Sequence, residues 1–164
     1  MLKSILPIII TIINLVQTQN INIPQYNVPL SQEIQEFIYI ECQNKDVEFE
    51  LILGMIELES SFNADLVCKN DNGTQDRGLM QINSCRDKEL TEQGYDNLLD
   101  PYQNIEVGIT IIADLLHKYE DEHKALICYN MGESGGKRQF DKGVYTTAYS
   151  RKVIEYKNKY KEDD

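Results

Sequence analysis

Apolar side chains recur at helical spacing along most of the chain. After Ser31, which can cap a helix, apolar residues at intervals of three and four predict a helix with one buried face. From about Val47 to Ser60, apolar side chains lie on almost every side of the expected helix, and such a helix is typically buried all round. These residues therefore predict two helices, of which the second lies within the core.

A third helix begins at a clear start signal. Asp100 is placed to cap it, Pro101 occupies its first turn, and Gln103 can return a bond to the cap. The helix is predicted to run to about Tyr119. One of its faces is an apolar stripe that should face the core, made of Ile105, Ile109, Ile112, Leu116 and Tyr119.

The last part of the chain predicts two more helices. The residues from His123 to Asn130 are typical of a short buried helix, and Gly132 to Gly136 are expected to form a glycine-rich loop. A final helix is predicted from Thr147 to Lys161.

Strand signals are weak. Asn72 and Gly73 favour a tight turn, and a calcium loop here is disfavoured because the ligand spacing of an EF-hand is incomplete. A short hairpin is expected around Leu79 to Ile82. The pattern as a whole predicts a mainly helical fold with no internal repeat and at most a small hairpin.

The N-terminal residues carry a different pattern. Lys3 precedes an apolar run over residues 5–16, which polar residues follow. A run of this length behind a lysine is typical of a signal peptide, and an uncleaved membrane tether stays open because no A-x-A cleavage signal follows. We therefore expect an export segment over residues 1–19, a proline-containing linker over residues 20–30, and one folded domain over residues 31–164.

The net charge of the chain limits the kinds of molecule that it can bind. The chain has 164 residues, enough for one compact domain, and a formal net charge of -11. Nucleic acid is excluded as a partner, because phosphate binding needs clustered lysine and arginine. A polyanionic substrate would have to be recognised by a shaped groove, with hydrogen bonds and ring stacking.

The metal-binding residues are few. The chain has four cysteines, of which no two have C-x-x-C spacing, and two histidines. A structural zinc site is therefore not expected, and no cofactor is expected either. One or two disulfides and four buried thiols both stay open for Cys42, Cys68, Cys85 and Cys128.

Glu59 is the first candidate for chemistry. A carboxylate at the end of an almost wholly apolar helix is costly to bury as an ion, so its pKa should rise. A glutamate that stays protonated near neutral pH suits a general acid. Glu57 lies roughly on the opposite side of the helix and cannot pair with Glu59. A buried glutamate held by a salt bridge or a helix end is an equally common interpretation.

Two further constellations are individually ambiguous. In the run from Gly78 to Ile82, glycine permits a tight chain path and Gln81 offers a donor and an acceptor among apolar neighbours. The run from Tyr129 to Gly132 offers an aromatic ring, an amide and a flexible glycine at a helix end. Taken singly, the first also fits a strand or turn with one satisfied polar residue, and the second a helix C-cap.

The order of these motifs resembles the lytic transglycosylase family, which shares its fold with goose-type lysozyme. Glu59-Ser60-Ser61-Phe62-Asn63 is similar to the family's catalytic glutamate motif, and Gly78 to Ile82 matches G-L-M-Q-I. The segment over 100–108, Tyr129-Asn130-x-Gly132 and the run from Thr146 to Val153 match in the same order. The resemblance covers about residues 31–160 and implies a lysozyme-like helical domain with a substrate cleft.

The resemblance implies an enzyme that cuts peptidoglycan strands outside the cell or at the cell wall. Glu59 would be the single catalytic acid and base, giving a 1,6-anhydro product with no second carboxylate needed, and the sequence shows no obvious candidate for one. The residues implied to bind substrate or line its cleft are Ser60, Met80, Gln81, Tyr129, Asn130 and Tyr149. Tyr149 is expected to hydrogen-bond Glu59. Two departures from the family pattern are Cys128, where alanine is usual, and Arg77, a charge expected to border the cleft.

Two rival interpretations stay open. A muramidase of lysozyme type would use Glu59 with water as the nucleophile, and an inactive wall-binding module would keep only the groove. Retention of Glu59, Gln81 and Tyr149 favours an enzyme over the module. The small size and the export segment suit a specialised enzyme that serves a secretion, conjugation or phage-derived machine.

Overall fold

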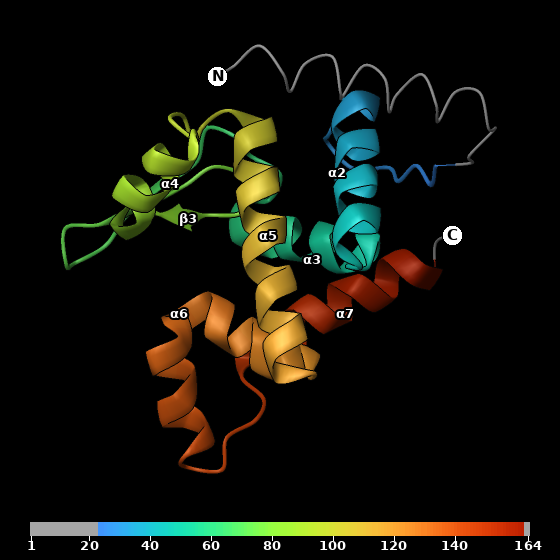
Figure 1. Ribbon diagram of the computed structural model, residues 1–164. Coiled ribbons are helices and arrows are strands. Elements are labelled where there is room, and N and C mark those ends of the chain that lie inside the picture. Colours follow the sequence, from blue (N-terminus) through green and yellow to red (C-terminus); the bar gives the residue numbers. More distant parts are fainter. Residues whose placement is uncertain (1–22, 163–164) are drawn as a thin grey trace.

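The computed structural model describes residues 23–162, a helical fold with a small antiparallel sheet at one side (Figure 1). Its elements are α2 (Gln32–Lys45), α3 (Phe49–Ser60), β1 (Val67–Lys69), β2 (Gln75–Arg77), β3 (Ile82–Asn83), a 3-10 turn (Ser84–Arg86), α4 (Asp87–Gln93), α5 (Pro101–Tyr119), α6 (Glu122–Phe140) and α7 (Ala148–Glu162). The mainly helical fold class expected from the sequence is confirmed.

The helix caps follow the sequence signals, but the bond that Gln103 was expected to return to the cap is not formed, because its side chain bonds residues 96 and 97. Ser31 caps α2 by accepting a hydrogen bond from the backbone N–H of Ile34, and Asp100 caps α5 by accepting one from the N–H of Gln103. Within the predicted stripe of α5, the first three isoleucines are fully buried, and Leu116 and Tyr119 pack against the core while partly exposed. The helix α4 was not predicted, because its seven residues carry only one buried apolar side chain, Leu90.

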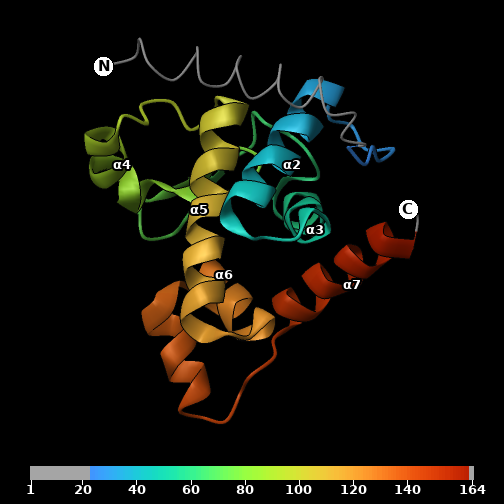
Figure 2. The same ribbon diagram turned by 45° about the vertical axis from the view of Figure 1, so that its right-hand side comes forward.

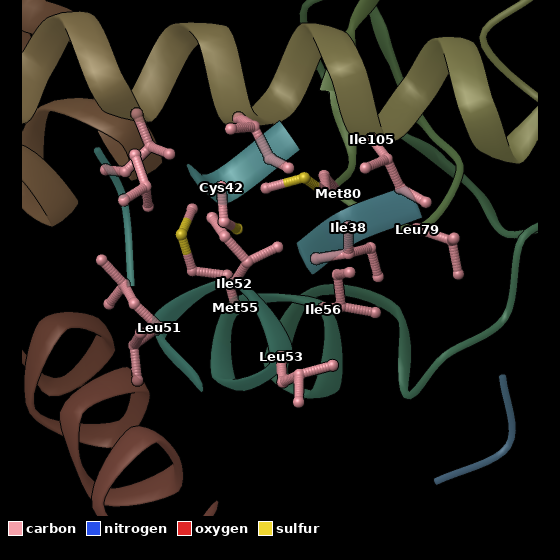
Figure 3. Close-up of a cluster of buried hydrophobic side chains, with 14 of the residues drawn as sticks. Ile38, Cys42, Leu51, Ile52, Leu53, Met55, Ile56, Leu79, Met80 and Ile105 are labelled. Carbon is pink, nitrogen blue, oxygen red and sulfur yellow. The ribbon is translucent and has the colours of Figure 1, made fainter. Parts of the chain in front are cut away.

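Helix α3 is the centre of the core, as its all-round apolar pattern predicted. Figure 3 shows its side chains, among them Ile52 and Ile56, packed between α2 and α5, which contribute Ile38 and Ile105 respectively. All four of these side chains have no exposed surface. The burial of α3 fixes the position of its C-terminal end, where Glu59 lies.

Helices α3 and α7 cross in close contact at Gly54. A Cβ atom placed on Gly54 would lie 3.0 Å from both the backbone nitrogen of Lys157 and the carbonyl oxygen of Val153. The Lys157 side chain is itself buried and pairs with Glu48 at 2.9 Å and with Glu122. These contacts hold α7, near the end of the chain, against the helix that carries Glu59.

The described part of the expected linker packs onto the helices. The backbone N–H of Tyr26 donates to Gln35 of α2 at 2.9 Å, and its hydroxyl donates to Glu50 of α3 at 2.9 Å. The Tyr26 ring makes edge contacts with Phe49 and Tyr160 and is only 8% exposed. Residues 23–30 have no helix or strand, but they add Tyr26 to the core.

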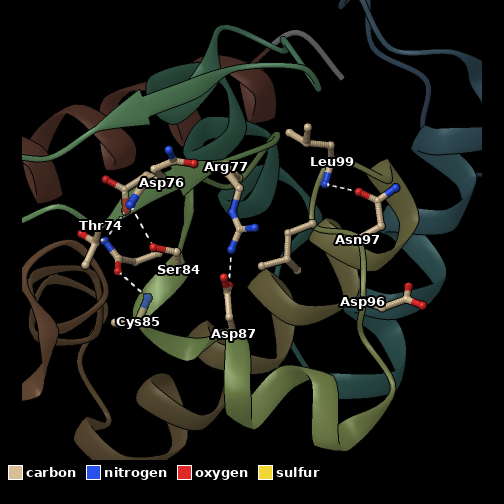
Figure 4. A network of polar contacts seen from close by, with 12 residues as sticks. Thr74, Asp76, Arg77, Ser84, Cys85, Asp87, Asp96, Asn97 and Leu99 are labelled. Atoms are coloured by element: carbon tan, nitrogen blue, oxygen red, sulfur yellow. Dashed lines mark hydrogen bonds and ion pairs between the residues drawn. The ribbon is translucent and has the colours of Figure 1, made fainter.

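The short hairpin expected around Leu79 to Ile82 is present, because β2 and β3 pair antiparallel across the tight turn from Gly78 to Gln81. The sheet is larger than expected, because β1 adds a third strand through a second hairpin, closed by the turn at Asn72 and Gly73. Figure 4 shows part of the polar network that joins these strands to the turn after β3. The tight turn expected at Asn72 and Gly73 is present, and the Asn70 side chain bonds Thr74 and Asp76 across it.

The glycine-rich loop expected over 132–136 is wrong. These residues are part of α6, which bends at Gly132 (φ 71°, ψ 157°), a backbone conformation that favours glycine. Gly136 faces the thiol of Cys128, which leaves no room for a Cβ atom. The glycines therefore permit one bend in the helix and one close contact between its turns. From the composition alone, the same glycines predict a loop.

The predicted export segment over 1–19, including the membrane tether over 5–16, lies outside the described residues. Among the helices of residues 23–162, none is long and apolar enough to cross a membrane.

Candidate active site

The site is built around Glu59 in the last turn of α3. The helix ends at Ser60, and Ser61 and Phe62 then take positive φ values of 50° and 64°, which turn the chain sharply away. The Glu59 carboxylate accepts a hydrogen bond of 2.5 Å from the hydroxyl of Tyr149, at the start of α7. The hydrogen bond expected between these two residues is therefore present, across 90 positions of sequence.

The surroundings of Glu59 favour its protonated form. Burial raises the pKa of Glu59 to about 7, the hydrogen bond from Tyr149 opposes this rise, and the negative charge of Asp76 adds to it. Glu57 points elsewhere, where its carboxylate accepts a bond of 2.5 Å from Tyr160. A carboxyl group poised near neutral pH can both give and take a proton.

Asp76 is a site residue that the sequence did not reveal. It lies on β2, and its two carboxylate oxygens accept from the side-chain amides of Asn70 at 2.9 Å and Asn83 at 2.6 Å. Its charge acts on Glu59 and on Tyr129. A prediction of β2 would have placed Asp76 and Arg77 on opposite faces of a strand and drawn attention to Asp76, but this strand was not predicted.

Tyr129 and Met80 link α6 to the turn after β2. The Tyr129 hydroxyl donates to the Met80 carbonyl oxygen at 2.8 Å, and burial together with the nearby Glu59 charge raises the pKa of Tyr129. The Met80 side chain has no exposed surface and packs where Gly108 of α5 leaves room for it. The Met80 side chain therefore lies in the core beneath the site. The resemblance implied instead that it would form an apolar wall of the cleft.

Asn104 of α5 holds the turn after β2 through hydrogen bonds. Its side chain accepts from the backbone N–H of Met80 at 2.7 Å and donates to the carbonyl oxygens of Arg77 and Leu98 at 2.8 and 2.9 Å. Asn104 has no exposed surface. Sequence reasoning missed this role, although a polar residue beside the buried stripe of α5 was a usable signal.

The other expected substrate residues differ in exposure. The Gln81 amide donates to the carbonyl oxygens of Gly78 at 2.8 Å and Leu66 at 3.2 Å, so that its side-chain oxygen can still accept a bond. Ser60 is 5% exposed, and its hydroxyl donates to Ile56 within α3. Asn130 is exposed on α6, next to Tyr129.

Arg77 does not share the side of β2 on which Asp76 acts. Successive side chains of a strand point to opposite faces, and Arg77 pairs with Asp87 at the start of α4 (Figure 4). The charge expected to border the cleft is thus compensated by an ion pair with α4.

The cysteines are spread over the fold. Cys42 and Cys128 are buried, Cys68 and Cys85 are exposed, and all four are free thiols. Within residues 23–162, no group of three histidine, cysteine or acidic side chains is arranged to hold a metal ion.

Comparison with known proteins identifies a family and several relatives. The family model of the transglycosylase SLT domain matches residues 36–150. The chain is similar to invasion protein IagB of Salmonella typhi, with 32% identity over 120 residues that cover 71% of this chain and 72% of the relative. It is also similar to a transglycosylase of Enterobacteria phage PRD1, with 34% identity over 104 residues that cover 63% of this chain and 35% of the relative.

Two solved structures share the fold. The lytic transglycosylase Slt from Pseudomonas aeruginosa is 18% identical, with a TM-score of 0.65 over 93% of this chain and 27% of that chain. The 70 kDa soluble lytic transglycosylase from Escherichia coli is also 18% identical, with a TM-score of 0.65 over 82% of this chain and 25% of that chain. The chain thus spans about a quarter of the length of these two structures.

Proposed function

The chain belongs to the transglycosylase SLT domain family and is a peptidoglycan lytic transglycosylase, and from this premise we propose that Glu59 is its single catalytic acid and base. The observation that carries the proposal is the partly buried Glu59 carboxyl, with a pKa of about 7 and a hydrogen bond from Tyr149.

The proposed reaction has two proton transfers. Protonated Glu59 gives its proton to the oxygen between N-acetylmuramic acid and N-acetylglucosamine while the C1–O bond breaks. The substrate's own N-acetyl group stabilises the positive charge at C1. The Glu59 carboxylate then takes the proton of the C6 hydroxyl as O6 bonds to C1. The products are a 1,6-anhydro end and a free sugar hydroxyl, and no water is consumed.

The neighbours of Glu59 have separate tasks in this proposal. Tyr149 holds the carboxyl in place and limits how far its pKa rises. Tyr129, through Met80, holds the turn that presents Gln81, whose free side-chain oxygen is suited to a sugar hydroxyl or acetamido N–H. Exposed Asn130 extends the polar lining of the cleft.

Hydrolysis of the same bond is the second candidate, and Asp76 is the observation that favours it. A second carboxylate that acts on the catalytic acid can orient a water molecule or stabilise charge at C1. The protein would then be a muramidase with the same acid. The two reactions differ in whether water is added to the new end.

We further propose that the enzyme is exported and works locally for a larger machine. The proposal rests on the apolar run over residues 5–16 and on the names of the relatives, one an invasion protein and one a phage transglycosylase. Fractionation of cells that produce the full chain tests export, and recovery in the cytosol alone would contradict it.

Digestion of purified peptidoglycan tests the reaction. We would compare the full chain with Glu59→Gln and with Glu57→Gln, a matched change on the same helix, and identify the released fragments by mass spectrometry. We expect products that lack one water, lost in Glu59→Gln and kept in Glu57→Gln. Hydrated reducing ends would establish the muramidase. Release by Glu59→Gln at the rate of the unmodified protein would refute the role of Glu59.

A further inference from the structure

Charge is distributed unevenly along the chain. Residues 23–117 hold five lysines and arginines against eighteen acidic residues, whereas residues 118–162 hold ten against seven. The second part therefore carries the positive charge of an otherwise acidic protein. A negatively charged ligand would be repelled by most of the surface and attracted to this part.

Part of this positive charge lies on an excursion of the chain, residues 132–147, which we call the arm. It comprises the second half of α6, after the bend at Gly132, and the loop that leads to α7. Figures 1 and 2 show it hanging below the rest of the fold. The arm begins two residues after Asn130 and ends two residues before Tyr149, so both of its ends lie close to the active site.

Three exposed cations on the arm are free to bind a ligand. Lys137, Arg138 and Lys142 are exposed, and none of them makes an ion pair with another residue of the described chain. In contrast, Lys152 and Lys157 at the start and middle of α7 are engaged with glutamates. The arm also carries Glu133, which pairs with Lys118 outside the arm, and Asp141, so its own net charge is +1. Lys137 acts on Glu133 as well, so the positive charge that a ligand can reach lies mainly on Arg138 and Lys142.

The arm is also held in a defined position. Glu133 pairs with Lys118 and accepts from the Tyr119 hydroxyl at 3.0 Å, which ties the arm to the end of α5. Phe140 contacts the Tyr119 ring and stacks on Tyr145 at 6.1 Å. A ligand would therefore meet charges that are already in place, at a small cost in ordering.

The Tyr145 ring completes the surface. It is 50% exposed although it stacks on Phe140, and the ammonium group of Lys124 lies 5.4 Å from its centroid. An exposed ring beside cations suits a ligand that combines apolar and anionic groups.

We propose that the arm binds the stem peptides of the glycan strand through their carboxylates, at sugars next to the bond that is cut. This proposal rests on the proposed function and adds a substrate feature to it. Among anionic ligands, the substrate's peptides are favoured because both ends of the arm lie close to the active site. A stem peptide that leaves a sugar held at Glu59 could then extend along the arm.

Binding to two forms of the strand tests the proposal. Glycan strands with their peptides, and the same strands freed of peptides by an amidase, are titrated with the full chain carrying Glu59→Gln, so that nothing is cut. The arm variant adds Arg138→Gln and Lys142→Gln. The control adds Lys69→Gln and Lys88→Gln, two exposed lysines away from the arm that also make no ion pair among the described residues, and removes the same charge.

We expect the arm variant to bind peptide-bearing strands about three- to tenfold more weakly, with the difference shrinking as salt is added. The control variant should bind both strands like the Glu59→Gln parent. On bare strands, whose only carboxylates are those the amidase leaves on the lactyl groups, the loss in the arm variant should be clearly smaller. Equal binding of peptide-bearing strands by the arm variant and its parent would overturn the proposal. Equal losses on both strands would also overturn it, because the peptides would not be the ligand.

Vesicles of phosphatidylglycerol provide the remaining comparison. Loss of vesicle binding in the arm variant, with strand binding intact, would overturn the proposal in favour of a membrane contact. Failure of the proposed function looks different. It would appear as absence of cleavage by the protein with Glu59 intact, while the binding comparison, made without cleavage, still reports on the arm.

Discussion

Replacing Glu59 with glutamine is expected to stabilise the protein, and to do so only above acidic pH. The ordinary pKa of a glutamate is 4.5, and burial holds that of Glu59 at about 7 in the folded protein. Between these values the unfolded chain releases the proton while the folded protein keeps it, so rising pH favours unfolding. Below about pH 4.5 both states are protonated, and Glu59 then has no such effect.

The size of the effect follows from the two pKa values. A gap of about 2.5 pH units, at about 1.4 kcal/mol for each unit, gives about 3 kcal/mol of folded stability lost between pH 4.5 and pH 7 and not regained above it. Glu59→Gln has no proton to release and escapes this loss. Its advantage over the unmodified protein should therefore be about 3 kcal/mol larger at pH 8 than at pH 4.

Urea unfolding followed by far-ultraviolet circular dichroism measures this difference, since the chain has no tryptophan. With a slope of about 1–3 kcal/mol per molar urea, the midpoint difference between the proteins should grow by about 1 M or more from pH 4 to pH 8. Glu89→Gln, on the exposed surface of α4, controls for the loss of one negative charge. An advantage of Glu59→Gln that is equal at both pH values would refute the idea that burial of Glu59 sets its protonation.

Four further changes test the surroundings of Glu59. Asp76→Asn removes a negative charge that raises the pKa of Glu59, so the fall of kcat/KM at alkaline pH should begin at lower pH; an unchanged pH profile would contradict this. Tyr149→Phe removes a bond that lowers the same pKa, so the fall should move to higher pH while kcat/KM drops about 10- to 100-fold; a drop without a shift would mean positioning alone. Asn104→Ala leaves three buried backbone groups without their partner and should cost about 3 kcal/mol or more in urea unfolding, and a cost below 1 kcal/mol would show that water replaces the amide. Gly54→Ala places a methyl group 3.0 Å from the α7 backbone, and should cost about 1–3 kcal/mol in urea unfolding and also lower kcat/KM; full activity would show that α7 can shift without moving Tyr149.

The sequence predicted the parts of the fold that depend on local periodicity. The all-round apolar pattern of α3 and the cap and stripe of α5 are properties of consecutive residues, and both were read correctly. The bend at Gly132 was not, because a glycine inside a helix and a glycine in a loop have the same local composition. The contact of Gly136 with Cys128, which explains the helix there, involves residues on two sides of the bend.

The residues of the candidate site also fall into those that the sequence predicted and those that it did not. Glu59 was visible because a charge stands out at the end of an apolar helix, and the resemblance pointed to Tyr149. Asp76 and Asn104 were missed because their roles depend on a sheet and a turn whose pairing is not periodic. Met80 was expected in the cleft and lies in the core, since the motif that contains it does not tell which side of the turn faces α5.

The bond between Glu59 and Tyr149 has a consequence for the order of events during synthesis. The two residues are 90 positions apart, and α3 leaves the ribosome long before α7. Until α7 packs across Gly54, Glu59 lacks the hydrogen bond from the Tyr149 hydroxyl, and the face of α3 that carries Gly54 is uncovered. A partly made chain therefore presents Glu59 without the hydrogen bond from Tyr149. Under the role proposed for Glu59, the site is complete only once α7 has packed in place.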